Sequence, residues 1–127
     1  MVKSRAVAHP PNQHWIRTYC ERYPNIKMVL AHAARSFNPI HAIEGMQTLS
    51  GLTNLWCDMA AVTEVGACEA IIDALGHERL MWGSDFPHQE SDWPDSMAML
   101  DRAFEGAPEE VRYQMTCGNA VDFFHLG

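Results

Sequence analysis

Two residues suited to acid–base or metal chemistry each follow a short apolar segment of this chain. His32 follows the segment 26–31, and Asp85 lies just after the segment 80–83. If both segments are parallel strands, their carboxyl ends meet at one rim of the sheet. We therefore expect His32 and Asp85 to lie within about 4–6 Å of each other, where each shifts the other's protonation. A neutral imidazole and a carboxylate placed in this way can bind a divalent metal together or exchange protons.

Four further residues near these segments have both a functional and a structural interpretation. His88, three residues after Asp85, could orient a substrate, or it is a structural histidine of a turn. Arg35 could hold an anionic substrate group through two hydrogen bonds, or it forms a surface ion pair. For Asp58, at the end of the middle apolar segment, we favour a structural role. Ser84 is not predicted to be a nucleophile, because its neighbours lack the G-x-S-x-G pattern.

Helical and extended patterns alternate along the chain. Short apolar runs between turn signals predict strands, at 26–31, 55–59 and 80–83. Apolar residues spaced by three and four predict helices, at 12–23, 40–49, 62–75, 93–104 and 108–126, the last interrupted near Gly118 and Asn119. Strands separated by helices pair in parallel, because a parallel return needs a connection of a dozen or more residues. The sequence therefore predicts an α/β fold with a small parallel sheet.

Composition limits the possible partners and location. The 127 residues carry a net charge of −7 without a block of Lys or Arg, which argues against a nucleic-acid partner. The apolar runs are shorter than the roughly 20 residues that span a bilayer, and no signal-peptide pattern is present, so we expect a cytoplasmic location and no membrane contact. The four cysteines are widely spaced, as expected of reduced thiols rather than a zinc or disulfide framework.

Three motifs together resemble a known family. They are Tyr-Pro-Asn-Ile-Lys-Met-Val-Leu-Ala-His at 23–32, Gly-Ser-Asp-Phe-Pro-His at 83–88 and Gly-Asn-Ala-Val-Asp-Phe-Phe at 118–124. From about residue 12 to 126 the chain resembles the carboxyl-terminal half of the amidohydrolase-related family. These proteins are metal-dependent TIM-barrel hydrolases and decarboxylases, among them decarboxylases of the aminocarboxymuconate semialdehyde and resorcylate types. The resemblance implies one domain over 1–127, a partial TIM (β/α)8 barrel with roughly strands 6 to 8 and their helices.

The resemblance also implies roles for single residues. His32 matches the histidine after the sixth strand, which acts as acid or base or lies beside the metal. Asp85 matches the aspartate after the eighth strand, which ligates the metal or activates its bound water, and Asn119 matches a structural asparagine. The family's first-strand His-x-His pair and fifth-strand histidine have no counterpart. We therefore expect Zn²⁺ or Mn²⁺ to bind to His32 and Asp85 in the complete enzyme, and weakly or not at all to this chain alone.

Three hypotheses of function follow from the sequence. The first is the carboxyl-terminal part of a metal-dependent enzyme that hydrolyses or decarboxylates a small carboxylated substrate, aromatic substrates included. The second is a catalytically inactive α/β module that acts through protein interaction. The third, a small ligand-binding α/β domain, ranks last because no Gly-rich phosphate loop is present. Open sheet edges lead us to expect self-association or a complementary barrel half as partner.

Overall fold

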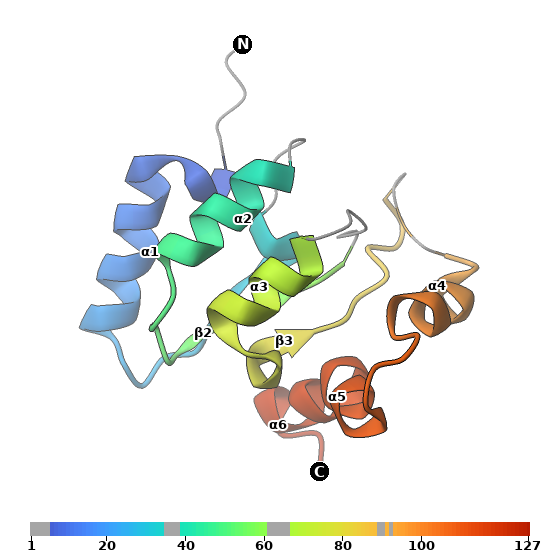
Figure 1. Ribbon diagram of the computed structural model, residues 1–127. Helices are drawn as coiled ribbons and strands as arrows, with labels where there is room; N and C mark the ends of the chain where they lie inside the picture. Colours follow the sequence, from blue (N-terminus) through green and yellow to red (C-terminus); the bar gives the residue numbers. More distant parts are fainter. Residues whose placement is uncertain (1–5, 35–38, 61–66, 89–90, 92) are drawn as a thin grey trace.

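Helices and short strands alternate along the chain, as Figure 1 shows. The structure is a computed structural model, and it describes residues 6–34, 39–60, 67–88, 91 and 93–127. The main elements are α1 (Pro10–Arg22), β1 (Met28–Leu30), α2 (Pro39–Thr48), β2 (Leu55–Asp58), α3 (Ala67–Leu75), β3 (Leu80–Met81), α4 (Ser96–Ala103), α5 (Glu109–Tyr113) and α6 (Asn119–Phe124). Short turns add η1 (Ala6–Ala8), η2 (Ala31–Ala34), η3 (His77–Arg79) and the π-helical turn η4 (Gln114–Gly118).

The strands form a parallel sheet in the order β1-β2-β3. Met28 is in register with Leu55, and Cys57 is in register with both Leu30 and Leu80. The predicted α/β fold with parallel pairing is confirmed. Each strand is shorter than the apolar run that predicts it, because the backbone turns into η2 directly after β1 and into an irregular loop after β3. The predicted helix 62–75 is observed from Ala67 onward, and its first residues lie outside the described part of the chain.

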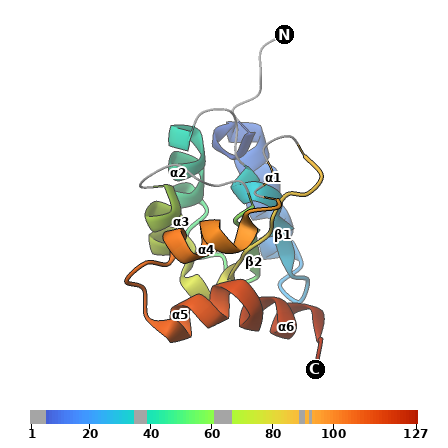
Figure 2. The same cartoon turned by 90° about the vertical axis from the view of Figure 1, so that its right-hand side faces the viewer.

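One face of the sheet forms the hydrophobic core with α2 and α3. Leu55 and Cys57 of β2 and Leu80 of β3 lie on this face, and each is fully buried. Figure 2 shows α2 and α3 side by side on one side of the sheet, with α5 and α6 below it. The core cluster consists of Val7, Cys20, Ala33, Met46, Leu49, Leu52, Leu55, Cys57, Met59, Ile71, Leu75, Leu80 and Met115. Burying each of the Val, Leu, Ile and Met side chains contributes about 1.5–3 kcal/mol, and this is the main source of stability.

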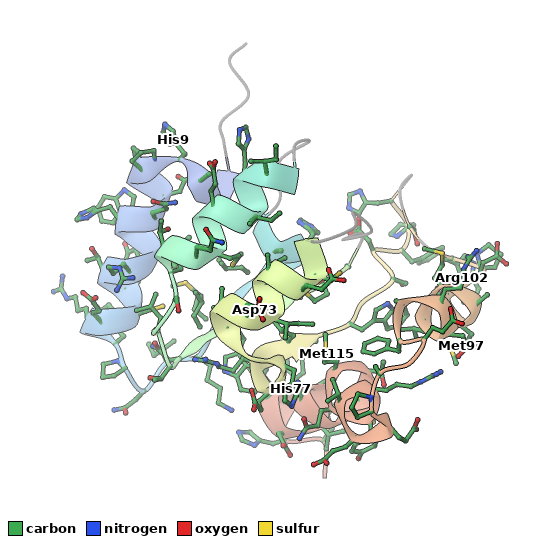
Figure 3. The ribbon with its side chains drawn as sticks, viewed as in Figure 1. His9, Asp73, His77, Met97, Arg102 and Met115 are labelled. Carbon is green, nitrogen blue, oxygen red and sulfur yellow. The ribbon has the colours of Figure 1, made fainter. Side chains whose placement is uncertain are left out.

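Helix α3 shows how the sequence pattern selects the buried face. Ile71 and Leu75 are four residues apart, lie on one face of the helix and are buried against the sheet. Asp73 lies between them in the sequence and is exposed on the opposite face, as labelled in Figure 3. Gly76 then adopts a φ of 80°, a left-handed conformation that ends the helix and favours glycine.

The opposite face of the sheet is partly covered by α6. The ring of Trp56 from β2 meets the ring of Phe123 edge to face, with centroids 5.1 Å apart. Lys27 Nζ lies 5.3 Å from the centroid of the Trp56 ring and 5.1 Å from that of Phe123, a cation–π geometry. Val29 on the same face of β1 remains 37% exposed.

Two asparagine side chains connect the sheet to neighbouring segments through hydrogen bonds to backbone carbonyl groups. The amide of Asn54 reaches the carbonyl oxygens of Cys20, Tyr23 and Ile26 at 2.8–3.1 Å and so holds the end of α1 against the start of β2. Asn119, only 5% exposed, donates to the carbonyls of His77 and Leu80 at 2.6 and 2.7 Å.

The second of these anchors joins β3 to the carboxyl-terminal helices. Figure 3 labels His77 and Met115 at this junction.

We predict that Asn119→Ala lowers the free energy of unfolding by about 1–3 kcal/mol, because one buried and one partly buried carbonyl group lose their donor. Urea unfolding followed by circular dichroism measures the change. Gln47→Ala, on the exposed surface of α2, is the control and should change stability by less than about 0.5 kcal/mol. Equal stability of the two variants would show that Asn119 does not anchor β3.

Candidate active site

His32 and Asp85 meet at the carboxyl-terminal rim of the sheet. His32 lies in η2, directly after β1, and Asp85 follows β3 by a short loop. The distance from His32 Nε2 to Asp85 Oδ1 is 4.0 Å. The predicted proximity of these two residues on one rim is therefore confirmed. The histidine side chain is 45% exposed and the aspartate side chain only 17%, so Asp85 is the more firmly held of the pair.

The backbone is strained at this rim. His32, Ala33 and Asp85 have φ angles of 43°, 53° and 59°, in the left-handed region that most residues avoid. Such conformations cost on the order of 1–3 kcal/mol each, and they are typical of functional sites held by the surrounding structure. His and Asp tolerate this region better than most residues, whereas Ala33 adopts it with its side chain fully buried.

Cys57 supports the turn that carries His32. Its side chain is fully buried on β2, its thiol donates a hydrogen bond to the Asp58 carbonyl at 3.4 Å, and the Ala33 N–H faces its sulfur. Burial raises the pKa of the Cys57 thiol to about 12, and the Ala33 N–H offsets only part of this effect. The thiol is therefore neutral at physiological pH and acts as a packing residue under the rim.

Hydrogen bonds shape the loop that follows Asp85. The N–H of His88 donates to the Asp85 carbonyl at 2.8 Å, which closes a turn. Ser91 Oγ donates to the Ser84 carbonyl at 2.7 Å and accepts the N–H of Trp93 at 3.1 Å. Ser91 therefore joins the two ends of this loop and supports the backbone that carries Asp85.

The other predicted residues are placed differently. The backbone of His88 hydrogen-bonds to Asp85 and Ser91, and the residue is exposed. Arg35 lies outside the described residues. Asp58 accepts the N–H of Ala60 at 2.6 Å, and a Cβ placed on Gly83 would lie 3.4 Å from its Oδ1. Asp58 thus stabilises a local turn next to the loop toward Asp85, in agreement with its predicted structural role.

No sequence pattern predicts the roles of Cys57 and Ser91. A small apolar-like cysteine in a strand is ordinary core composition, and a serine in a polar loop is common. The signal for Asp58 was present, since short acidic side chains often bond to a backbone N–H two residues further on.

The His32–Asp85 pair fits a metal ion as part of its ligand set. Zinc binds nitrogen and oxygen donors at about 2.0–2.2 Å, which places two tetrahedral ligand atoms about 3.3 Å apart. The 4.0 Å separation approaches this value after a small rotation of the exposed imidazole. Within the described ranges, no group of three or more His, Cys, Asp or Glu side chains is arranged to hold a metal. The pair can therefore supply two ligands, and a site of four needs others.

Comparison with known proteins defines the class of this fold and site. The amidohydrolase family model matches residues 4–126. Two crystal structures of an amidohydrolase from Burkholderia multivorans are similar to the chain. The one with bound zinc has a TM-score of 0.73, 21% identity, and coverage of 91% of this chain and 49% of that chain. The one with bound HEPES has a TM-score of 0.71, 20% identity, and coverage of 91% and 50%. No curated protein matches the chain significantly.

The chain belongs to the amidohydrolase family, and its fold is part of the TIM barrel of that family. It spans about half the length of the two crystallised chains. The specific resemblance to the decarboxylases stays a prediction. In the described residues, no helix has the length and apolar character needed to cross a membrane.

We predict that the purified chain binds Zn²⁺ or Mn²⁺ only weakly, because two donors make an incomplete site. A metal present below its Kd stabilises the folded state by less than about 0.4 kcal/mol. Thermal unfolding with and without metal should therefore give nearly equal Tm values, for the native chain and for Asp85→Ala alike. Elemental analysis that finds one tightly held equivalent, lost in Asp85→Ala, would contradict this prediction.

Proposed function

We propose that this chain forms the carboxyl-terminal part of a metal-dependent enzyme of the amidohydrolase family. In this proposal His32 and Asp85 are catalytic residues and metal ligands, and the substrate is a small carboxylated molecule, aromatic substrates included. The observation that carries the proposal is the 4.0 Å approach of an imidazole and a carboxylate on a strained rim. Side chains at this end of barrel strands form the active sites of TIM-barrel enzymes.

The two side chains differ in how firmly they are held, and this difference suggests their roles. A separation of 4.0 Å is too long for a direct hydrogen bond, and it leaves room for a shared water or ion between the two groups. Asp85, mostly buried, suits the fixed role of ligand or general base at its carboxylate oxygens. His32 is half exposed, and its Nε2 can take a proton at the rim and deliver it to the substrate.

When present, a divalent cation, Zn²⁺ or Mn²⁺, would polarise the substrate and lower the pKa of a water molecule bound to the cation. The zinc in the similar Burkholderia structure supports this part of the proposal. His32 and Asp85 would hold the ion together with ligands from outside the described residues. Hydrolysis and decarboxylation use the same pair differently: in hydrolysis Asp85 removes a proton from water, whereas in decarboxylation His32 supplies a proton to the carbon that loses carbon dioxide.

The substrate's negative charge would be recognised near the same rim. We propose Arg35 and His88 as substrate-binding residues, since both closely follow a rim residue in the sequence. All four cysteines are free thiols, which is compatible with the reducing cytoplasm that we propose as location.

We predict that metal-dependent turnover requires a complementary barrel half. To measure turnover, the chain is co-expressed with the amino-terminal half of a similar amidohydrolase. The assembly is then screened with carboxylated esters, lactones and aromatic acids. Asp85→Asn and His32→Gln should each lower kcat by about 10²–10⁴.

His14→Gln is the matched control, because this exposed histidine lies on α1, and it should leave kcat unchanged. Turnover that survives Asp85→Asn would contradict the assigned role of Asp85. An assembly that holds zinc and remains inactive on every substrate would favour the other hypothesis, an inactive module that acts through protein interaction.

A further inference from the structure

Two large aromatic side chains lie side by side in the loop that follows Asp85. The ring centroids of Phe86 and Trp93 are 5.9 Å apart, and the ring planes are inclined by 67°, an edge-to-face geometry that aromatic pairs favour. The two residues are 63% and 62% exposed, whereas the side chain of Asp85 is only 17% exposed. The rings therefore form an exposed aromatic corner directly after the more buried residue of the candidate site.

Hydrogen bonds connect the aromatic corner to the backbone on both sides of Asp85. Ser91 Oγ accepts the Trp93 N–H at 3.1 Å and donates to the Ser84 carbonyl at 2.7 Å. Trp93 is thereby connected to the residue before Asp85. Phe86 is the residue after Asp85, and its N–H donates to Ser84 Oγ at 3.3 Å. The backbone that holds the carboxylate therefore also holds both rings.

The N–H groups of this loop leave little hydrogen-bonding capacity for a ligand. In addition to the bonds of Phe86 and Trp93, His88 donates its N–H to the Asp85 carbonyl at 2.8 Å, and Ser91 donates to the His88 carbonyl at 3.0 Å. These four N–H groups are thus bonded within the loop. A ligand rich in hydroxyl groups loses free energy where its polar groups find no partner. The corner is therefore better suited to a flat apolar ring.

A second group of exposed aromatic residues, on α1, has a different geometry. Trp15 stacks on Tyr19 and Tyr19 on Tyr23, with planes inclined by only 26° and 16°. Nearly parallel rings turn their faces toward one another, whereas the inclined planes of Phe86 and Trp93 leave ring faces open to a third ring. The α1 group therefore serves as an internal comparison for the aromatic corner.

We propose that Phe86 and Trp93 are specificity-determining residues of the His32–Asp85 site and that they bind the planar ring of an aromatic carboxylic acid. The inference rests on the proposed function, because it assigns the corner to the substrate of that site. The ring of the acid packs against one aromatic side chain face to face with an offset and against the other edge to face, the two arrangements that such rings favour. Its reacting group then lies at the rim beside Asp85.

The test is a titration of the ¹⁵N-labelled chain with benzoate, followed by NMR of the indole N–H groups of its four tryptophans. Benzoate should shift the Trp93 indole signal, which Trp93→Phe identifies, and the ring signals of His32, both saturably. Cyclohexanecarboxylate has the same charge and carbon number but a puckered ring, and gluconate is rich in hydroxyl groups. Both should bind about fivefold more weakly than benzoate, because neither stacks as an aromatic ring.

Phe86→Leu keeps an apolar side chain, removes one ring and should weaken benzoate binding about fivefold. Trp15→Leu is the matched control: it removes a 55% exposed aromatic side chain from α1 and should leave the affinity unchanged. Circular dichroism verifies that both variants are folded, as expected for exposed positions.

Four results would each overturn the proposal. They are the absence of a Trp93 shift, a Trp93 shift without a shift at His32, equal binding of benzoate and cyclohexanecarboxylate, and native affinity in Phe86→Leu. The titration needs neither metal nor turnover, so its failure is distinct from failure of the proposed chemistry. A failed titration would leave the roles of His32 and Asp85 intact, whereas a wrong assignment of those roles appears in kcat.

Discussion

The parallel pairing of β1, β2 and β3 is the constraint on which the candidate site depends. His32 and Asp85 are far apart in the sequence, and no described hydrogen bond joins them directly. They meet because the register of each strand with β2 brings both carboxyl ends to one rim. A shift of one residue in either pairing would turn side chains such as Cys57 away from the core, so core packing and site geometry are fixed together.

The strain at the rim is balanced by the core beneath it. Ala33 adopts a left-handed conformation without the polar side chain that usually accompanies it, and it does so next to the buried thiol of Cys57. Any larger side chain at position 33 would compete with the core for space. The β2 layer therefore holds the turn in place, and the turn presents His32 at the rim. On the other side, the loop bridged by Ser91 has the same function for Asp85.

The helices, the strands and their parallel pairing could be predicted from the sequence, but the local backbone conformations around them could not. Short apolar runs such as 26–31 and the regular spacing in α3 predict strands and helices because burial imposes those periods. The proximity of His32 and Asp85 followed from parallel strands alone. In contrast, the π-helical turn η4, whose Met115 carbonyl accepts the N–H of Trp82 at 2.9 Å, has no signal in residues 114–118. The left-handed conformation of Ala33 was equally hidden, since glycine usually marks such positions.

The face of the sheet opposite α2 and α3 is more exposed at β1 than at β3. In a complete barrel the helices lie outside, and the face opposite them is filled by side chains from all strands. Here that face carries Met81 on β3, which is 5% exposed, and Val29 on β1, which is 37% exposed. Between them, Trp56 on β2 is covered by Phe123 of α6. On this face the side of β3 is thus covered, whereas the described part of the chain leaves Val29 on β1 partly exposed. The carboxyl-terminal helices thus cover β3 through Asn119 and the turn η4, and the described residues provide no comparable cover for β1.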